Sequence, residues 1–354
     1  MQEIKGPSFF IGKDSEELIS FGSGQPDLPP PEEVYQILPT YRDFKYGLIQ
    51  GQERLRQALT AQYPKSSKEQ FVVTNGASEA LDLTLRALFE PGAKILLPTP
   101  YYYSYPYIVK FAHMEPVYYE QDKGKIVFDD FKQKVKGCKA VVINSPSNPT
   151  GTVQNLETLK KIEKLTKELG VWVISDEVYK DLIYVRENYL IKGKHVLTLN
   201  SFSKTYAMCG FRIGYLYARD VDVINRVIEI KTHVSMNTNI LGQDMAFEAT
   251  KVPREFIDSQ TKVWKSRRNL IYEGMKDLGL DLWKPEGAFY VFPEMKNPSK
   301  VVSDLYHLYN IIVYNGAWFG DPTRVRFSYA LDEEKIVEGL RRVKEYMGKE
   351  YKEN

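Results

Sequence analysis

Short apolar runs alternate with helical patterns between residues 71 and 218, and this alternation constrains the fold more than any other feature of the sequence. It is typical of a mostly parallel sheet between helices, so we expect an α/β fold with a seven-stranded sheet. In such sheets ligands bind beyond the carboxyl ends of the strands, where chemistry should be sought. The expected strands are Phe71–Val73, Lys94–Leu97, Glu115–Tyr119, Ala140–Asn144, Val171–Ser175, Val196–Asn200 and Ile213–Tyr217.

The remaining patterns predict helices between these strands and a smaller α+β domain after them. Apolar residues at helical spacing mark Glu79–Phe89, Ser104–Phe111, Asp129–Val135, Leu156–Leu169 and Arg254–Leu278. The C-terminal third adds expected strands at Ala288–Phe292, Ile311–Tyr314 and Val325–Tyr329, and a final helix at Asp332–Met347. We therefore predict a large domain over residues 31–262 and a small domain formed by residues 1–30 and 263–354.

Composition excludes several classes of function. The 48 lysines and arginines nearly balance the 46 aspartates and glutamates, so the charge gives no reason to expect a nucleic-acid partner. No apolar run resembles a signal peptide or a membrane span, and the two cysteines, Cys138 and Cys209, form no C-x-x-C pair. We expect a cytoplasmic protein. The four histidines and two cysteines show no metal-ligand spacing, and neither G-x-G-x-x-G before a helix nor G-x-S-x-G occurs.

The most informative segment is Ser201–Gly214, with the sequence SFSKTYAMCGFRIG. Lys204 follows an expected strand, hydroxyl side chains precede it, and Arg212 comes eight residues later. An aldehyde that carries a phosphate requires such a setting, because it needs an amine nucleophile of lowered pKa and donors for the phosphate.

This segment resembles the signature S-x-[SA]-K followed by G-x-R-x-G of the class I/II aminotransferases, the aspartate aminotransferase superfamily of pyridoxal 5'-phosphate (PLP) enzymes of fold type I. The resemblance extends from about residue 20 to residue 345. It implies that Lys204 carries PLP as a Schiff base, and that Ser201 and Arg212 bind the phosphate. The turn TNGASEAL opens a helix, whose N-terminus favours an anion. There the resemblance assigns Gly76, Ala77 and Ser78 to the phosphate.

Three further matches concern the cofactor ring. Asp176 and Tyr179 lie in DEVY, similar to the family's D-E-x-Y, so Asp176 is expected to keep the pyridine nitrogen protonated and Tyr179 to donate to the phenolic oxygen. The alternative for Asp176 is a cap of a following helix. Asn148 lies in NSPSNPTG, similar to N-x-P-x-N-P-T-G, and is expected to contact the phenolic oxygen and the substrate carboxylate. Tyr102 occupies the position of the stacking aromatic ring.

Three more matches concern the substrate and a second subunit. Arg326, in RVRFSY, resembles the arginine that grips the substrate's α-carboxylate, although the strand pattern alone does not distinguish it from Arg324. Gly24, in SGQPD, resembles the loop that lines the substrate site. Tyr46 resembles a tyrosine that reaches the partner's phosphate across a homodimer interface.

The resemblance therefore implies an enzyme of amino-acid metabolism, an aminotransferase that passes the amino group of an L-amino acid to a 2-oxo acid by a ping-pong mechanism. A β-lyase or decarboxylase would share the same cofactor residues. A PLP-binding regulator would carry a basic DNA-binding module, for which the chain has no room before residue 20. Tyrosines 101, 102, 103, 105 and 107 favour large apolar or aromatic substrates. No second arginine is found for a distal carboxylate, and Lys231 and His233 are the alternatives.

Overall fold

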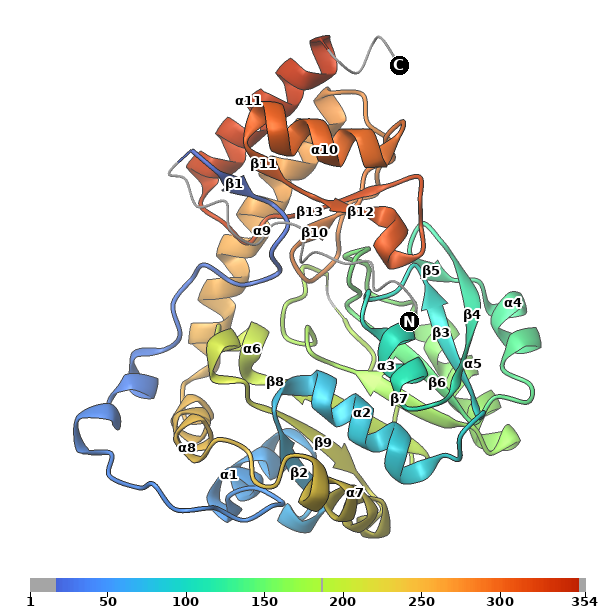
Figure 1. Ribbon diagram of the computed structural model, residues 1–354, viewed down its shortest axis with the longest axis vertical. Helices are drawn as coiled ribbons and strands as arrows, with labels where there is room; N and C mark the ends of the chain where they lie inside the picture. Colours follow the sequence, from blue (N-terminus) through green and yellow to red (C-terminus); the bar gives the residue numbers. More distant parts are fainter. Residues whose placement is uncertain (1–16, 186, 350–354) are drawn as a thin grey trace.

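The computed structural model describes residues 17–185 and 187–349. Its largest element is an eight-stranded sheet of order β2-β9-β8-β7-β6-β3-β4-β5, in the lower half of Figure 1. Strands β8, β7, β6, β3 and β4 pair in parallel, whereas β9 runs antiparallel to both β2 and β8. The strands are β2 (Phe71–Thr74), β3 (Lys94–Thr99), β4 (Glu115–Asp122), β5 (Lys125–Ile126), β6 (Ala140–Asn144), β7 (Trp172–Asp176), β8 (Val196–Ser201) and β9 (Gly214–Ala218).

Different helices cover the two faces of this sheet, because successive side chains of a strand point to opposite faces. Ile95 and Leu97 of β3 share a buried cluster with α2 (Gly76–Leu88), α3 (Tyr105–Phe111) and α7 (Val221–Val234). Leu96, between them, packs in another cluster with α4 (Phe128–Lys134) and α5 (Leu156–Leu169). Strands β2 and β9 add a third cluster with α1 (Glu53–Leu59) and α8 (Ile240–Ala249). Strands β6 and β8 are buried along their whole length, as parallel strands covered on both faces are.

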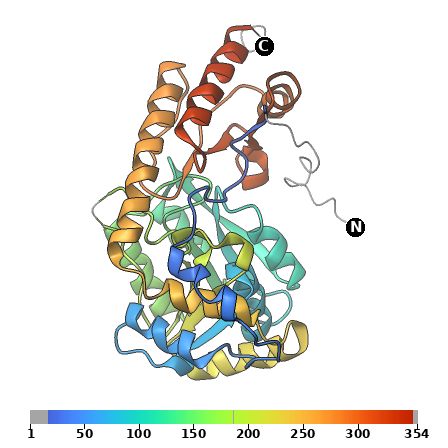
Figure 2. The ribbon, with the colours of Figure 1, turned by 90° about the vertical axis from the view of Figure 1, so that its left-hand side faces the viewer.

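A smaller α+β part lies above the large sheet in Figure 1. Its antiparallel sheet has the order β10 (Tyr290–Val291), β13 (Val325–Ser328), β12 (Tyr314–Asn315). The helices α9 (Arg254–Asp277), α10 (Pro298–Tyr309) and α11 (Glu333–Lys349) pack with it around a cluster that includes Trp264 and Phe327. Strand β1 (Ile19–Ser20) pairs in parallel with β11 (Ile311–Ile312), and the chain after β1 descends from the smaller part to the large sheet (Figure 2).

Several short helices complete the described structure. Helix α6 (Phe202–Thr205) follows β8 directly. Single 3₁₀ turns lie at Glu32–Tyr35, Leu38–Thr40, Thr60–Gln62, Lys68–Gln70, Cys209–Phe211 and Gly316–Phe319. None of the helices within residues 17–185 and 187–349 combines the length and apolar character needed to cross a membrane.

The predicted fold class is confirmed, and each of the seven predicted strands lies in the large sheet. The predicted number of strands in the large sheet was one too few. The missing strand, Lys125–Ile126, pairs antiparallel with the end of β4, and a strand of two residues shows no alternation from which it could be predicted. The predicted strand Ile311–Tyr314 is two strands with different partners. Helices α1, α6, α7, α8 and α10 were not predicted. The division into a large domain at residues 31–262 and a small domain at residues 1–30 and 263–354 stays a prediction, and residues 1–16, 186 and 350–354 of it lie outside the described residues.

Candidate active site

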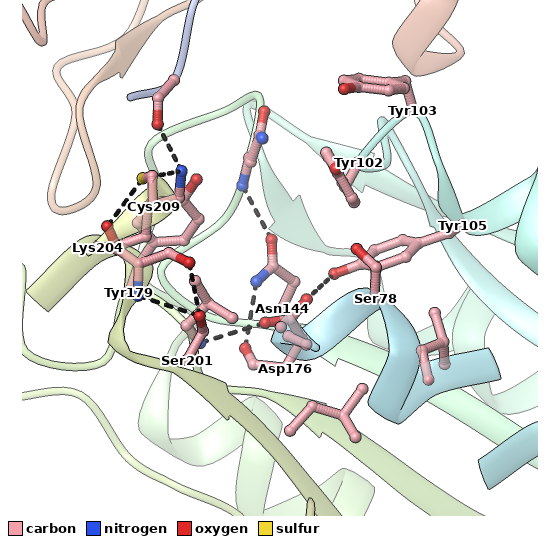
Figure 3. Close-up of a pocket in the computed structure, with 18 of the residues that line it drawn as sticks. Ser78, Tyr102, Tyr103, Tyr105, Asn144, Asp176, Tyr179, Ser201, Lys204 and Cys209 are labelled. Carbon is pink, nitrogen blue, oxygen red and sulfur yellow. Dashed lines mark hydrogen bonds between the residues drawn. The ribbon is translucent and has the colours of Figure 1, made fainter. Parts of the chain in front are cut away.

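A cavity of about 290 Å³ lies between the two sheets, beyond the carboxyl ends of β6, β7 and β8 (Figure 3). The last residue of each of these strands, Asn144, Asp176 and Ser201, lines it, as the rule for parallel sheets predicts. All of the site residues predicted from the sequence line this cavity except Tyr46; they are Gly24, Gly76, Ala77, Ser78, Tyr102, Asn148, Asp176, Tyr179, Ser201, Lys204, Arg212 and Arg326.

Lys204 projects its amine into the cavity from α6. The helix begins where it does because the Ser201 hydroxyl accepts a hydrogen bond from the Ser203 N–H at 3.1 Å. Lys204 Nζ donates to the carbonyl oxygen of Gly24 at 2.5 Å and lies 3.7 Å from Cys209 Sγ. Burial lowers the pKa of Lys204, and the two nearby arginines lower it further, while Cys209 acts in the opposite direction. The amine therefore loses its proton more readily than that of an exposed lysine.

Asp176 ends β7 and is almost fully buried. Its Oδ2 accepts a hydrogen bond from the Tyr105 hydroxyl at 2.5 Å, and its Oδ1 accepts one from the Val178 N–H at 3.2 Å. Burial raises the pKa of this carboxyl, whereas these two hydrogen bonds lower it. No helix begins within residues 177–185, so the alternative interpretation of Asp176 as a helix cap is wrong. Its carboxylate is instead fixed at the floor of the cavity.

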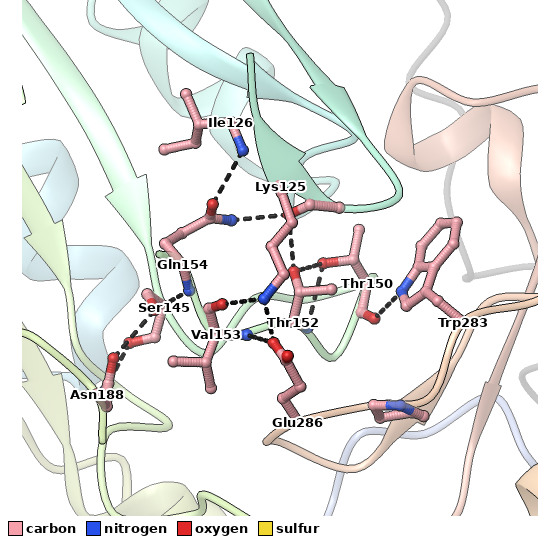
Figure 4. Close-up of polar contacts among 12 residues, drawn as sticks. Lys125, Ile126, Ser145, Thr150, Thr152, Val153, Gln154, Asn188, Trp283 and Glu286 are labelled. Atoms are coloured by element: carbon pink, nitrogen blue, oxygen red, sulfur yellow. Dashed lines mark hydrogen bonds and ion pairs between the residues drawn. The ribbon is translucent and has the colours of Figure 1, made fainter. Parts of the chain in front are cut away.

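Asn148 lies in the loop after β6, and its backbone N–H donates to Asn144 Oδ1 at 2.9 Å. The rest of the loop is held by a polar network (Figure 4). Gln154 Nε2 donates to the Gly124 carbonyl at 2.7 Å, and the carbonyl of Thr150 accepts from Trp283 Nε1 at 2.8 Å. Lys125 and Glu286 form an ion pair beside it. These contacts connect the loop to the β4–β5 hairpin and to the chain before β10, which fixes the position of Asn148 between the two sheets.

A second set of lining residues gathers where β2 runs into α2. Gly76 has a φ of +78°, and a Cβ added there would lie 2.7 Å from Arg212 Nη2. The left-handed backbone favours glycine here, and the absence of a side chain leaves room for the guanidinium. Arg212 Nη1 donates to the carbonyl of Cys209 at 2.9 Å, and Ser201 Oγ lies 2.9 Å from the carbonyl of Ile213. A helix N-terminus, a hydroxyl and an arginine together form a setting for an anion.

Arg326 lines the opposite side of the cavity from β13 and is only 2% exposed. Its Nη1 donates to Asn148 Oδ1 at 2.9 Å and its Nη2 to the Gly22 carbonyl at 2.5 Å. Its Nε has no hydrogen-bond partner among the described residues. The guanidinium packs against three rings, those of Tyr290, Tyr314 and Phe319, at 4.5 to 4.8 Å. A buried, oriented guanidinium of this kind suits a carboxylate ligand.

The structure also separates Arg326 from Arg324, which the strand pattern did not. Arg324 precedes β13 and does not line the cavity. Its guanidinium lies within ion-pair distance of three carboxylates, those of Asp281, Glu294 and Asp321. It also packs on the ring of Trp283 at 4.5 Å. Arg324 is therefore committed to contacts outside the site.

Aromatic side chains form much of the remaining wall. The ring of Tyr102 packs edge-to-face on Tyr105 and is tilted against Tyr103. The hydroxyls of Tyr179 and Tyr290 lie 2.7 Å apart. Of the five tyrosines at positions 101 to 107, those at 102, 103 and 105 line the cavity, whereas Tyr101 and Tyr107 do not. Only part of the predicted aromatic cluster therefore belongs to the site.

Tyr46 and Lys231, two further candidates from the sequence, lie outside the cavity of this chain. Tyr46 is 84% exposed and belongs to a separate surface depression with Phe44 and Ile240. Lys231 is fully buried in an ion pair of 3.2 Å with Glu79, and neither it nor His233 lines the cavity. Lys231 is therefore already neutralised, and the suggestion that it contacts a distal substrate carboxylate is wrong.

Other lining residues were not predicted from the sequence. They include Asn144, Cys209, Tyr290 and Tyr314. Asn144 and Cys209 lie inside motifs that the sequence analysis identified, so their position near the site could have been predicted. Tyr290 and Tyr314 lie in two-residue strands of the smaller sheet. No local pattern in the sequence indicates that these two side chains face the cavity.

Comparison with known proteins agrees with this geometry. Residues 16–343 match the family described as aminotransferase class I and II. A probable aspartate/prephenate aminotransferase of Aquifex aeolicus is 33% identical, over 93% of this chain and 90% of its own. The crystal structure of an aspartate aminotransferase from Thermotoga maritima superimposes with a TM-score of 0.88, at 29% identity over 94% of this chain and 92% of that one. An aromatic aminotransferase from Pyrococcus horikoshii gives 0.87, at 30% identity over 94% and 96%.

Proposed function

Because the chain belongs to the class I and II aminotransferases, we propose that it passes the amino group of an L-amino acid to a 2-oxo acid such as 2-oxoglutarate in two separate half-reactions, a ping-pong mechanism. The protein is a PLP-dependent aminotransferase. One observation carries the proposed mechanism. An amine of lowered pKa, a buried carboxylate and a buried guanidinium, those of Lys204, Asp176 and Arg326, line the same cavity.

The residues of the cavity fit this cofactor. When bound, PLP supplies an aldehyde that condenses with amino groups and a ring that accepts electrons from the substrate's Cα. The backbone N–H groups of residues 76–78 and the guanidinium of Arg212 would hold its phosphate, in the space that a Cβ on Gly76 would fill. Asp176 would hold the ring nitrogen and Tyr102 the face of the ring. Tyr179 and Asn148 would donate to the phenolic oxygen.

Lys204 is the proposed acid and base. Its amine would hold the cofactor covalently at rest and would be freed when the substrate amine takes its place. The free amine would then accept the proton from the substrate's Cα and carry it during the transfer. Burial favours the unprotonated amine that this step needs, since it lowers the pKa of Lys204.

Arg326 is the proposed anchor of the substrate's α-carboxylate. Asn148 and the Gly22 carbonyl hold the two terminal nitrogens, so the plane of the guanidinium is fixed before the substrate arrives. The three surrounding rings exclude water from it, which strengthens a charge-assisted hydrogen bond. A carboxylate held there orients the bonds at Cα, which selects the one that breaks.

The test of this function is a screen of amino donors with 2-oxoglutarate and the PLP-loaded protein. Glutamate formation and oxo-acid formation should be equal, and double-reciprocal plots at several oxo-acid concentrations should be parallel, as ping-pong kinetics require. Release of ammonia or carbon dioxide without formation of glutamate would instead indicate lyase or decarboxylase chemistry.

We predict that phenylalanine and tyrosine are better donors than aspartate. The names of the similar proteins include both aspartate and aromatic aminotransferases and do not decide the question. Tyr102, Tyr103 and Tyr314 line the cavity, and among the described lining residues the only cations are Lys204 and the two arginines already assigned. Burial of a large apolar side chain contributes roughly 1.5–3 kcal/mol, so kcat/KM for the aromatic donors should exceed that for aspartate by about tenfold or more.

The measurement is kcat/KM for phenylalanine, tyrosine, aspartate and glutamate with one saturating oxo acid. Glutamate should be accepted with a high KM. If aspartate exceeds the aromatic donors tenfold, the prediction is wrong, and a cation from a second subunit becomes the first candidate for its distal carboxylate.

We also propose that the enzyme is a homodimer in which Tyr46 contributes to the partner's phosphate site. Phe44, Tyr46 and Leu48 are 88%, 84% and 58% exposed, and so many exposed apolar residues in one short segment suit an interface. Tyr46→Phe should weaken PLP binding by about tenfold, the worth of one hydrogen bond to a charged group, without changing the melting temperature. Tyr35→Phe, on another exposed turn, is the control. A monomer in sedimentation experiments, or unchanged affinity, would refute the assignment.

The remaining proposal concerns the compartment. Both cysteines, Cys138 and Cys209, are free. We propose that the enzyme works in the cytoplasm, where thiols stay reduced and amino acids and 2-oxo acids meet.

A further inference from the structure

Tyr105 makes a contact that the proposed mechanism does not use. It is the first residue of α3, and its hydroxyl donates to Oδ2 of Asp176, 71 residues further along the chain, at 2.5 Å (Figure 3). Both side chains are buried, at 2% and 9% exposure, and both line the cavity. The contact therefore lies at the floor of the site, out of reach of bulk water.

An ionised carboxylate accepts about four hydrogen bonds, and Asp176 uses its two oxygens on Tyr105 and on the Val178 N–H. Lone pairs remain for a donor in the cavity. If that donor is the ring nitrogen, one proton is shared between two groups that both prefer to be neutral in a dry site. A hydrogen bond to the carboxylate makes it a weaker base and so favours the proton on nitrogen.

We propose that Tyr105 is a positioning residue that keeps Asp176 ionised and aimed at the cofactor's ring nitrogen, so that the shared proton stays on the nitrogen. The inference rests on the proposed function, because it assigns Asp176 to that nitrogen. It adds that the carboxylate alone does not suffice. At this buried position, a neutral carboxyl and an unprotonated ring nitrogen compete with a carboxylate and a protonated ring nitrogen, and the Tyr105 hydroxyl favours the charged form.

The surroundings of the pair support this division of roles. Burial raises the pKa of Tyr105 well above its usual value, so the phenol stays a donor. The other titratable groups nearby are Tyr102, whose ring packs on Tyr105, Tyr119 and Glu177. Glu177 does not line the cavity, and its Oε1 accepts from the Ser175 hydroxyl at 3.1 Å. Of these groups, only the Tyr105 hydroxyl donates to the carboxylate of Asp176.

The test compares Tyr105→Phe with the wild type in PLP-loaded enzyme that carries ¹⁵N in the cofactor ring. The ¹⁵N resonance of the wild type should be that of a protonated pyridine, and that of Y105F should move toward the unprotonated value. The kcat should fall by about tenfold, as for loss of one hydrogen bond to a charged group, with a smaller change in KM. Tyr119→Phe is the matched control, because Tyr119 is equally buried but donates to the Val142 carbonyl outside the cavity.

Two further measurements keep the inference open to refutation if Y105F folds poorly. A 3-fluorotyrosine at position 105 keeps the shape but is a stronger donor, so it should hold the proton on nitrogen at least as firmly as tyrosine. In an Asp176→Asn background Y105F should cause no further fall in kcat, since the carboxylate through which it acts is gone. An unchanged ¹⁵N resonance in Y105F, or equal losses in both backgrounds, would overturn the inference. If the wild type itself shows no protonated nitrogen, the assignment of Asp176 fails instead.

Discussion

Replacement of Lys204 by alanine is expected to reduce turnover by roughly a thousandfold or more, because it removes both the covalent attachment and the group that carries the proton. PLP should still bind without a covalent bond, since the residues proposed for its phosphate and ring, such as Arg212, Ser78 and Tyr102, are separate from the amine. The fold should survive as well. The side chain makes few contacts, with Nζ bonded to one carbonyl, that of Gly24, and near one thiol.

Three measurements check this result: kcat with the best donor, PLP affinity by dialysis, and peptide mass spectrometry after borohydride reduction. The wild type should yield a labelled peptide that contains Lys204, and the variant none. Lys180→Ala is the matched control, because Lys180 bonds to Gln62 outside the cavity. A labelled lysine elsewhere, or full turnover in K204A, would remove the basis of the proposed mechanism.

The predictions that succeeded concern residues whose position depends on local sequence. Asp176 ends one buried strand of the sheet and Lys204 comes shortly after another, and the carboxyl ends of parallel strands meet at one edge. The alternation of apolar runs was therefore enough to predict that the two side chains lie together. Gly76 was assigned by the resemblance, and it lines the same cavity where β2 runs into α2.

The features that were missed depend on contacts between distant segments. The partner of Asp176 is set by how α3 packs on the sheet, and nothing near Tyr105 in the sequence indicates that its hydroxyl faces a carboxylate. The sequence suggested that Lys231 could bind a distal substrate carboxylate, but its amine pairs with Glu79, 152 residues away. Arg324 and Arg326 have the same spacing as two residues on one face of a strand, but β13 begins between them. Periodicity could not place that boundary.

The same distant contacts explain why the site is built from both parts of the molecule. Arg326 of the smaller sheet bonds to Asn148 after β6 and to Gly22 of the N-terminal segment. Lys204 bonds to Gly24 of the same segment. The N-terminal segment, which β1 attaches to the smaller part, thus touches both the proposed acid–base group and the proposed substrate anchor. A change in this segment should affect substrate binding before it affects the large sheet.

Asp176→Asn is expected to lower kcat by about a hundredfold to a thousandfold, the range for loss of one preorganised electrostatic contact. The amide keeps the shape of the carboxylate. Its single oxygen can accept from the Val178 N–H while its NH₂ group donates to the Tyr105 oxygen, so the fold should be little affected. The charge is lost, and without it the ring nitrogen would not be held protonated. The loss should therefore appear in kcat far more than in the melting temperature.

Asp181→Asn is the control, because Asp181 is five residues further along the chain and pairs with Arg254 at 2.8 Å outside the cavity. Its kcat should equal that of the wild type. Measurement of kcat, KM and melting temperature for both variants separates the two roles that a buried carboxylate can have. If D176N turns over normally but melts many degrees lower, Asp176 stabilises the turn after β7 and does not hold the ring nitrogen. A purely structural carboxylate would act through the hydrogen bonds that it accepts from the Val178 N–H and the Tyr105 hydroxyl, and not through its charge.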